Sequence, residues 1–272
     1  ARKTYINCFS ETHFQTYFSN MMESIEGETC CSKIYVDKKI SVVIPTYNPG
    51  KSLVKLVNRI LKQKLVKEIE LIMVDSGSSD DSVKIANDLG VTVIEIPHEE
   101  FSHSYARNLG ALQAKGDIIV FMTQDALPSS HTWLNELCAP LISGEAVATS
   151  CTEINPDGTE MFYRVLSYGY AEFRKIDNGK KTINYKEAGD DRLELRKKAS
   201  LTDVSTAILS EIFKDYYYRH DYAEDLDLGI RLLNDGYKIA LLGNVGTVHG
   251  HNRPASYYLK RNYVEALSFV TI

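Results

Sequence analysis

From residue 40 onward the sequence alternates between strand-like and helix-like segments. The apolar, strand-like segments are ISVVIPTY (40–47), IELIMV (69–74), VTVIEI (91–96) and DIIVFM (117–122). The segments between them open with helix-starting residues or carry apolar residues at helical spacing: 48–61, 78–90 and 102–115. Alternation of this kind requires right-handed crossovers, so the sequence predicts an α/β fold with a mainly parallel sheet flanked by helices.

Acidic residues follow two of these predicted strands. Asp75 comes directly after IELIMV, and Thr123, Gln124 and Asp125 follow DIIVFM. In parallel α/β sheets, ligands bind outside the carboxyl ends of the strands. Two carboxylates at one edge of the sheet therefore predict a place for a metal-bound phosphate or a ribose.

Composition narrows the class of protein. The chain has 272 residues, enough for one large domain or a domain with a substantial appendage. Its formal net charge is −5, and no basic stripe is evident, which argues against duplex nucleic acid as the main partner. No apolar run approaches the roughly 18 residues of a membrane span.

The cysteines indicate a reducing compartment. Their number is odd and their spacing fits neither CxxC nor a zinc site, so we expect free thiols at Cys8, Cys30, Cys31, Cys138 and Cys151. We expect a cytoplasmic protein. Ala1 is not an initiator methionine and Ile272 interrupts a helix-like segment, so we also expect a piece of a longer chain.

Four regions are expected along the chain. Residues 1–39 are a polar lead-in or linker, 40–150 the ligand-binding half, 151–254 a second half, and 255–272 a C-terminal helix. Within the second half, we expect residues 174–198 to be a mobile, solvated loop because they are rich in charge and glycine. A helix is predicted from about 222, with one apolar stripe formed by Leu226, Ile230, Leu233 and Tyr237. YKIALLG and GNVGTVHGH then read as two strands.

Several motifs, taken in order, resemble one family. They are SVVIPTYN (41–48), VDSGSSDDS (74–82), ARN (106–108), the acidic turn at 123–125 and AEDLDLGIRLLNDGY (223–237). The set resembles inverting nucleotide-sugar glycosyltransferases of family 2, over roughly residues 40–255. The resemblance implies the GT-A fold, a Rossmann-like sheet whose C-terminal portion lies on the acceptor side.

Three further segments narrow the resemblance. FSHSYARNLGA (101–111), TQDALP (123–128) and VHGH (248–251) are similar to bacterial rhamnosyltransferases of that family, which build surface polysaccharides such as O-antigen or capsule. The expected donor is therefore dTDP-rhamnose, and the expected acceptor a saccharide or a lipid-linked saccharide. A UDP-sugar donor is the alternative, because Asp75 could serve either base.

The resemblance also assigns candidate residues for the nucleotide sugar. They are Pro45, Thr46, Tyr47, Asn48, Asp75, Arg107, Gln124 and Asp125. Alternatives remain open from the residues themselves. Asp75 before Gly77 is also a common turn aspartate, Asp80 could simply cap the next helix, and an arginine on a helix usually faces solvent.

A divalent cation is implied at Asp125. Relatives commonly carry Asp-x-Asp at this position, whereas this chain has Thr123-Gln124-Asp125, a form that the rhamnosyltransferase-like relatives share. His249 and His251 would point to the same face of an extended segment. By resemblance one of them completes the metal shell, with His249 favoured slightly, and imidazole suits Mn²⁺ better than Mg²⁺.

The general base is assigned to Asp225, the second acid of the family's Glu-Asp motif. Glu224 and Asp227 would also be expected in a first helical turn without any function. His103, Asp203 and Glu224 are candidates for contacts with donor or acceptor. Trp133 and Tyr216–Tyr218 are more typical of packing.

Two other classes of protein are alternatives. A nucleotidyltransferase would need a glycine-rich, basic phosphate loop after the first strand, and PTYNPGKS (45–52) matches that poorly. A nucleotide-sugar-binding module of a larger polymerase, without turnover, is a further alternative. In the C-terminal segment, aromatic residues beside Lys260 and Arg261 suit peripheral association with the inner face of the membrane, although a helix packed on the core explains them equally well.

Overall fold

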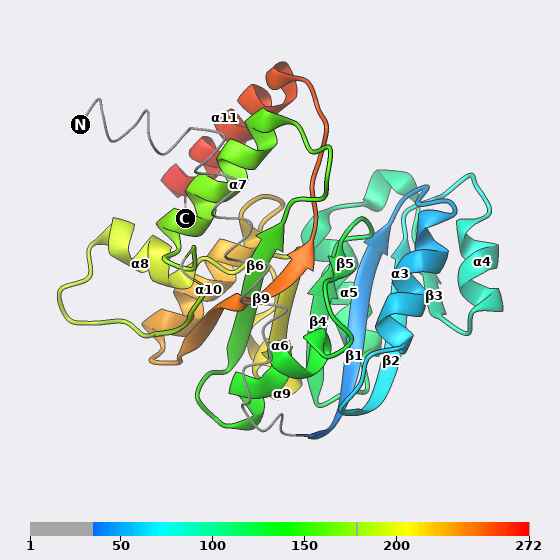
Figure 1. Ribbon diagram of the computed structural model, residues 1–272, viewed down its shortest axis with the longest axis horizontal. Helices are drawn as coiled ribbons and strands as arrows, with labels where there is room; N and C mark the ends of the chain where they lie inside the picture. Colours follow the sequence, from blue (N-terminus) through cyan, green and yellow to red (C-terminus); the bar gives the residue numbers. More distant parts are fainter. Residues whose placement is uncertain (1–34, 178, 272) are drawn as a thin grey trace.

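The protein is described here by a computed structural model covering residues 35–177 and 179–271 (Figure 1). The described residues form one nine-stranded sheet with helices on both faces. The strands are β1 (Val36–Thr46), β2 (Val66–Asp75), β3 (Thr92–Glu95), β4 (Ile118–Met122), β5 (Leu127–Pro128), β6 (Ala148–Ile154), β7 (Lys181–Asn184), β8 (Ser205–Leu209) and β9 (Ile239–Val248). The helices are α3 (Ser52–Leu61), α4 (Ser82–Asp88), η1 (His98–Glu100), α5 (His103–Gln113), α6 (Trp133–Ile142), α7 (Met161–Phe173), α8 (Arg192–Ala199), α9 (Ser210–Tyr216), α10 (Glu224–Asn234) and α11 (Ala255–Thr271).

The first four strands along the chain form the parallel part of the sheet, in the order β3-β2-β1-β4. Successive residues of β1 face opposite sides, and both sides are buried. Val42 and Ile44 belong to the core that packs against α3 and α6, whereas Val43 belongs to the core on the α5 and α10 side. This burial explains the continuous apolar runs in the sequence, because a strand covered on both faces has no solvent-facing positions for polar residues.

The second half of the sheet is mixed. β8 lies antiparallel between β4 and β6, and β9 then pairs parallel with β6. Because β8 is antiparallel to both β4 and β6, strands β6 and β9 run in the same direction as β4. The carboxyl ends of β1, β2, β4, β6 and β9 therefore lie at one edge of the sheet. The amino end of β8 lies at the same edge. The predicted α/β sheet with flanking helices is confirmed, and the division expected at residue 150 falls within β6.

The expectation of a mobile loop at 174–198 was wrong. This segment contains β7, which pairs antiparallel with β9, and α8, which packs on α10. Asp191 caps α8 by accepting a hydrogen bond from the backbone of Glu194. Lys198 pairs with Asp190 and Glu187. The charge that suggested a solvated loop is thus used in caps and ion pairs.

Two expectations about the following segments were also wrong. The predicted pair of strands is the single strand β9, which continues through Gly243. A Cβ at Gly243 would lie 2.3 Å from the backbone oxygen of Ile176, so close packing requires glycine here. The helix predicted from 222 is α10, which ends at Asn234, so Tyr237 lies beyond the helix and not on its apolar stripe.

Helices α7 and α11 lie beside each other above the sheet in the view of Figure 1. Their contact is aromatic: the Phe162 and Tyr258 rings lie 5.3 Å apart. None of the helices in the described part of the chain combines the length and apolar character needed to cross a membrane. Cys138 and Cys151 are free, as expected, and both are buried; the other cysteines and most of the lead-in lie outside the described residues.

Candidate active site

The predicted site residues come from many segments that meet at the same edge of the sheet. Tyr47 and Asn48 follow β1, Asp75 ends β2, and Asp125 follows β4. His249 and His251 follow β9, while Asp203 precedes β8, whose amino end reaches this edge. The topology therefore brings residues that are distant in sequence to one place, as open α/β sheets do at the carboxyl ends of their strands.

Asp125, His249 and His251 form what we name the Asp-His-His cluster. Its ligand atoms all lie within 4.8 Å of one another. The Nε2 atom of His249 is 3.5 Å from Oδ1 of Asp125, and Nδ1 of His251 is 3.6 Å from Oδ2 of the same carboxylate. His249 is buried, whereas about half of the Asp125 side chain faces solvent.

Opposite charges dominate the titration of this cluster. Burial alone would lower the pKa of His249, but hydrogen bonds to Asp125 and Glu153 raise it to about 10. Burial opposes ionisation of Asp125, yet the hydrogen bond and the charge of His249 hold its pKa well below the ordinary value. Burial and the charge of His249 lower the pKa of His251.

The cluster fits a divalent cation. Ligand atoms bound at about 2.1 Å from one cation lie within about 4.2 Å of each other, close to the spacing found here. One carboxylate and two imidazoles suit Mn²⁺ better than Mg²⁺. Three protein ligands also leave coordination positions for phosphate oxygens and water.

A second group, which we name the buried acid cluster, consists of Asp203, Glu224, Asp225 and Arg107. One guanidinium nitrogen of Arg107, Nη1, lies 3.0 Å from Oδ2 of Asp203 and 2.8 Å from Oε1 of Glu224. Arg107 is only 3% exposed. This arginine therefore faces neither solvent nor the Asp125 turn: it compensates acids at the start of α10 and β8.

Asp225 is held by two backbone donors within this cluster. The N–H of Leu226 donates to its Oδ1 at 2.8 Å, and the N–H of Asp203 donates to its Oδ2 at 3.3 Å. Burial and the negative charge of Asp203 raise the pKa of Asp225. The same two causes raise the pKa of Glu224. A carboxylate with a raised pKa is a stronger proton acceptor once it is ionised.

Asp75 lies at the floor of the β1 and β2 ends and is fully buried. Its oxygens accept hydrogen bonds from the backbone and hydroxyl of Ser78, at 2.8 and 2.6 Å, and from the Thr46 hydroxyl at 3.1 Å. These contacts organise the turn after β2. Asp80 also accepts a hydrogen bond from the backbone of Ser82, at the start of α4, which is the capping alternative for that residue.

Gln124 connects the ends of β1 and β4. Its side-chain oxygen accepts from the backbone N–H of Tyr47 at 2.8 Å, and its amide donates to the backbone oxygen of Tyr47 at 3.2 Å. The Tyr47 ring stacks on His98, with 4.7 Å between centroids, while Asn48 accepts from the backbone of Ser79 at 2.8 Å. Exposed stacked rings beside a strand end can receive a flat base.

The remaining predicted residues have structural surroundings. His103 begins α5, and its exposed ring meets the ring of Phe101 edge-on, with 5.1 Å between centroids. Pro45 lies within β1 opposite Val74. Trp133 is buried and its indole donates to Thr247, while Tyr218 donates to Oδ1 of Asp203 at 2.6 Å.

Three residues at the site were missed from the sequence: Glu153, Tyr163 and His98. Oε2 of Glu153 lies 2.8 Å from Nδ1 of His249, and the Tyr163 hydroxyl donates to that same oxygen. Glu153 stands near the end of ATSCTEI, a buried strand rich in Thr and Ser. The continuous apolar run that marked Asp75 and Asp125 is absent here, so that signal does not identify Glu153.

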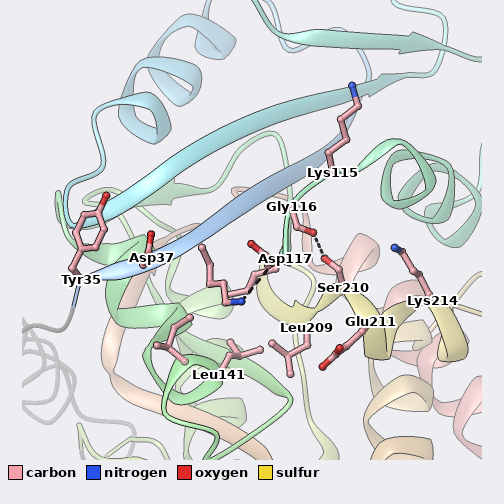
Figure 2. Close-up of a pocket in the computed structure, with 13 residues that line it drawn as sticks. Tyr35, Asp37, Lys115, Gly116, Asp117, Leu141, Leu209, Ser210, Glu211 and Lys214 are labelled. Carbon is pink, nitrogen blue, oxygen red and sulfur yellow. Dashed lines mark hydrogen bonds and ion pairs between the residues drawn. The ribbon is translucent and has the colours of Figure 1, made fainter.

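The pocket drawn in Figure 2 lies elsewhere. It is lined by the start of β1, the turn before β4, the end of α6 and the start of α9, which is the opposite edge of the sheet. Its lining mixes lysines with acids: Lys38, Lys115, Lys214, Asp37, Asp117 and Glu211. Balanced charges of this kind give no preference for a phosphate.

Comparison with known proteins gives a consistent result. The model of the family described as "Glycosyl transferase family 2" matches residues 41–218. The O-antigen chain rhamnosyltransferase RfbN of Salmonella typhimurium is 28% identical over 219 residues, covering 79% of this chain and 67% of the relative. The O-antigen chain rhamnosyltransferase WbaN of Salmonella anatum is 26% identical over 220 residues, covering 78% and 66%. The chain thus spans about two thirds of the length of these relatives.

Solved structures share the fold. The mannosyltransferase PcManGT from Pyrobaculum calidifontis, in complex with GDP-Man and Mn²⁺, has a TM-score of 0.64 at 15% identity, covering 94% of this chain and 70% of that one. S. aureus TarS 1-349 in complex with UDP-GlcNAc has a TM-score of 0.59 at 20% identity, covering 79% and 59%.

Proposed function

The chain belongs to glycosyl transferase family 2, and from that premise we propose that it transfers a sugar, with inversion, from a nucleotide sugar to a hydroxyl of a saccharide or lipid-linked acceptor. One observation carries the proposal. The Asp-His-His cluster and the buried acid cluster lie at the same edge of the sheet, so a leaving diphosphate and an attacking hydroxyl can be served together.

The donor is assigned to residues 40–150. Tyr47 and Asn48 would hold the nucleoside at the ends of β1 and β2, on the turn that the buried Asp75 organises, with Gln124 joining this part to the Asp125 turn. The similarity to two O-antigen chain rhamnosyltransferases supports dTDP-rhamnose as the donor and surface-polysaccharide synthesis as the process. A UDP-sugar donor is the competing assignment.

Asp125 and His249, with His251, would hold Mn²⁺ or Mg²⁺. Such a cation neutralises the charge that develops on a departing diphosphate. The remaining duties fall to the protein. The buried Asp75 turn fixes the loop that carries Ser78 and Ser79, and the Gln124 amide fixes the loop that carries Tyr47.

Residues 151–254 would bind the acceptor and supply the base. The acceptor hydroxyl attacks the anomeric carbon from the side opposite the diphosphate. A new carbon–oxygen bond forms, the sugar–phosphate bond breaks with its electron pair leaving on the diphosphate, and the hydroxyl proton passes to the Asp225 carboxylate. Asp225 is suited to this role by its raised pKa and by the two backbone hydrogen bonds that orient it.

A panel of nucleotide sugars tests this proposal. Binding and hydrolysis of dTDP-rhamnose, UDP-glucose, UDP-N-acetylglucosamine and GDP-mannose are measured with Mn²⁺ and with chelator. We expect dTDP-rhamnose to bind and to be hydrolysed slowly in the presence of Mn²⁺. Exclusive binding of UDP-sugars would refute the rhamnose assignment, and binding without turnover of any donor, with acceptors supplied, would favour a binding module.

A further inference from the structure

The two ring nitrogens of His249 face two different carboxylates. Nε2 lies on the side of Asp125, 3.5 Å away, whereas Nδ1 lies 2.8 Å from Oε2 of Glu153. A hydrogen bond at one ring nitrogen determines which nitrogen is free for a cation. Resting on the function proposed above, we propose that Glu153 and Tyr163 are positioning residues that hold His249 with Nε2 turned toward the cation.

Three separate elements meet in this arrangement. Glu153 lies in β6 opposite Thr247 of β9, and Thr247 precedes His249 by two residues in the chain. Tyr163 belongs to the first turns of α7, and its hydroxyl donates to Oε2 of Glu153 at 3.2 Å. One carboxylate oxygen thus accepts both from Tyr163 and from the Nδ1–H of His249, which defines the plane of the ring.

The surroundings of His251 differ in kind. Among the described residues, its carboxylate partner is Asp125 alone, at 3.6 Å, and its ring meets the edge of Tyr163 at 5.5 Å between centroids. His251 is 21% exposed in its side chain, compared with 6% for His249. We therefore assign His249 as the oriented ligand and His251 as an adjustable one.

The test measures the Mn²⁺ dissociation constant of the whole chain from the electron paramagnetic resonance signal of free Mn²⁺. It does not depend on turnover. Glu153→Gln keeps the size of the side chain and removes its charge. We expect it to raise the Mn²⁺ dissociation constant about 10- to 100-fold, the usual effect of losing an outer-shell partner. Tyr163→Phe removes one hydrogen bond and is expected to give a smaller increase. Asp157→Asn, an exposed acid in the next turn, is the charge-matched control and is expected to change nothing.

The outcomes distinguish a failure of the positioning role from a failure of the cation site itself. An unchanged dissociation constant in Glu153→Gln, at an unchanged melting temperature, overturns the positioning role. If Glu153→Gln does not fold, Tyr163→Phe decides in the same way. His251→Ala weakening Mn²⁺ binding more than His249→Ala also contradicts the assignment. If the unaltered chain binds no Mn²⁺, the cation site of the proposed function itself fails, and the inference fails with it.

Discussion

The backbone N–H of Asp203 donates a hydrogen bond to the side chain of Asp225 at 3.3 Å. Asp203 lies just before β8, and Asp225 lies in the first turn of α10, so this contact joins the sheet edge to the helix that carries the proposed base. The side chain and the backbone of Asp203 act on Asp225 in opposite senses. The negative charge of Asp203 disfavours ionisation of Asp225, whereas its backbone fixes the carboxylate in place.

A pH dependence follows from this contact. Asp225 must be ionised to accept a proton, and its raised pKa means that it becomes protonated at a higher pH than an ordinary aspartate. The transfer rate should therefore fall as the pH decreases through this raised pKa and should level off above it. In Asp203→Asn the repelling charge is gone, so we expect the falling limb to move to lower pH. The measurement is kcat against pH at saturating donor and acceptor.

Asp88→Asn, which removes an exposed acid on α4, serves as the control and should leave the limb in place. A limb that stays where it is in Asp203→Asn, or moves to higher pH, would show that the group titrating in the rate profile is not Asp225.

Asp125→Ala should abolish metal-dependent donor turnover. The substitution removes the carboxylate that faces both imidazoles. About half of the side chain is exposed and His249 keeps Glu153 as a partner, so the fold should survive, with a melting temperature within about 4 °C of the unaltered chain. Donor hydrolysis by both proteins is measured with Mn²⁺ and with chelator. Differential scanning calorimetry gives the melting temperature of each. Full activity in the variant, or in the unaltered chain with chelator, contradicts the metal assignment.

Arg107→Leu should destabilise the fold severely. Arg107 is 3% exposed and one of its nitrogens contacts both Asp203 and Glu224. Removing one partner from a buried ion group leaves uncompensated charge, which typically costs about 3–5 kcal/mol of unfolding free energy. Arg219→Leu, at an exposed position, is the matched control. Urea unfolding measures both, and a loss under about 1 kcal/mol in Arg107→Leu would mean that the acids of the cluster are not held as ions by this arginine.

The sheet edge and the strand-end acids were predictable because they depend on local patterns. An apolar strand covered on both faces reads as a continuous apolar run, and a polar residue directly after it marks the carboxyl end. That reasoning located Asp75 and Asp125 and, with the ordered motifs, the family. The two cysteines in the described part, Cys138 and Cys151, are free as expected.

What the sequence could not provide depends on distant pairing. Arg107 meets its acidic partners only because the start of β8 lies beside α10. Glu153 meets His249 only because β6 pairs with β9. The charged segment 174–198 was misread because composition does not distinguish solvated charges from charges that cap and pair within a helix. Strand β9 was read as two strands meeting at Gly243, because the close backbone approach that requires glycine there leaves no local signal.

The exposed side of α11 supports a prediction about membranes. Tyr258 is buried, while Tyr257, Leu259 and Tyr263 are 42%, 73% and 66% exposed. Replacing both Leu259 and Tyr263 by serine should weaken binding to vesicles containing phosphatidylglycerol roughly tenfold or more, because a buried leucine contributes about 1.5–3 kcal/mol. Flotation of vesicles measures this, with Leu112→Ser on α5, 63% exposed, as the control. Equal flotation of the unaltered chain, the double variant and Leu112→Ser would contradict a role of α11 in membrane binding.

The central claim is that the two clusters have separate duties, the Asp-His-His cluster toward the donor and the buried acid cluster toward the acceptor hydroxyl. The most direct test measures donor dissociation constants and transfer rates side by side for Asp225→Asn and the unaltered chain. Asparagine keeps the size of the side chain but cannot take up the proton, so we predict a rate lower by about 10²–10⁴-fold with donor affinity nearly unchanged. A large loss of donor binding with a normal rate at saturating donor would contradict the claim, because Asp225 would then hold the donor and another residue would be the base.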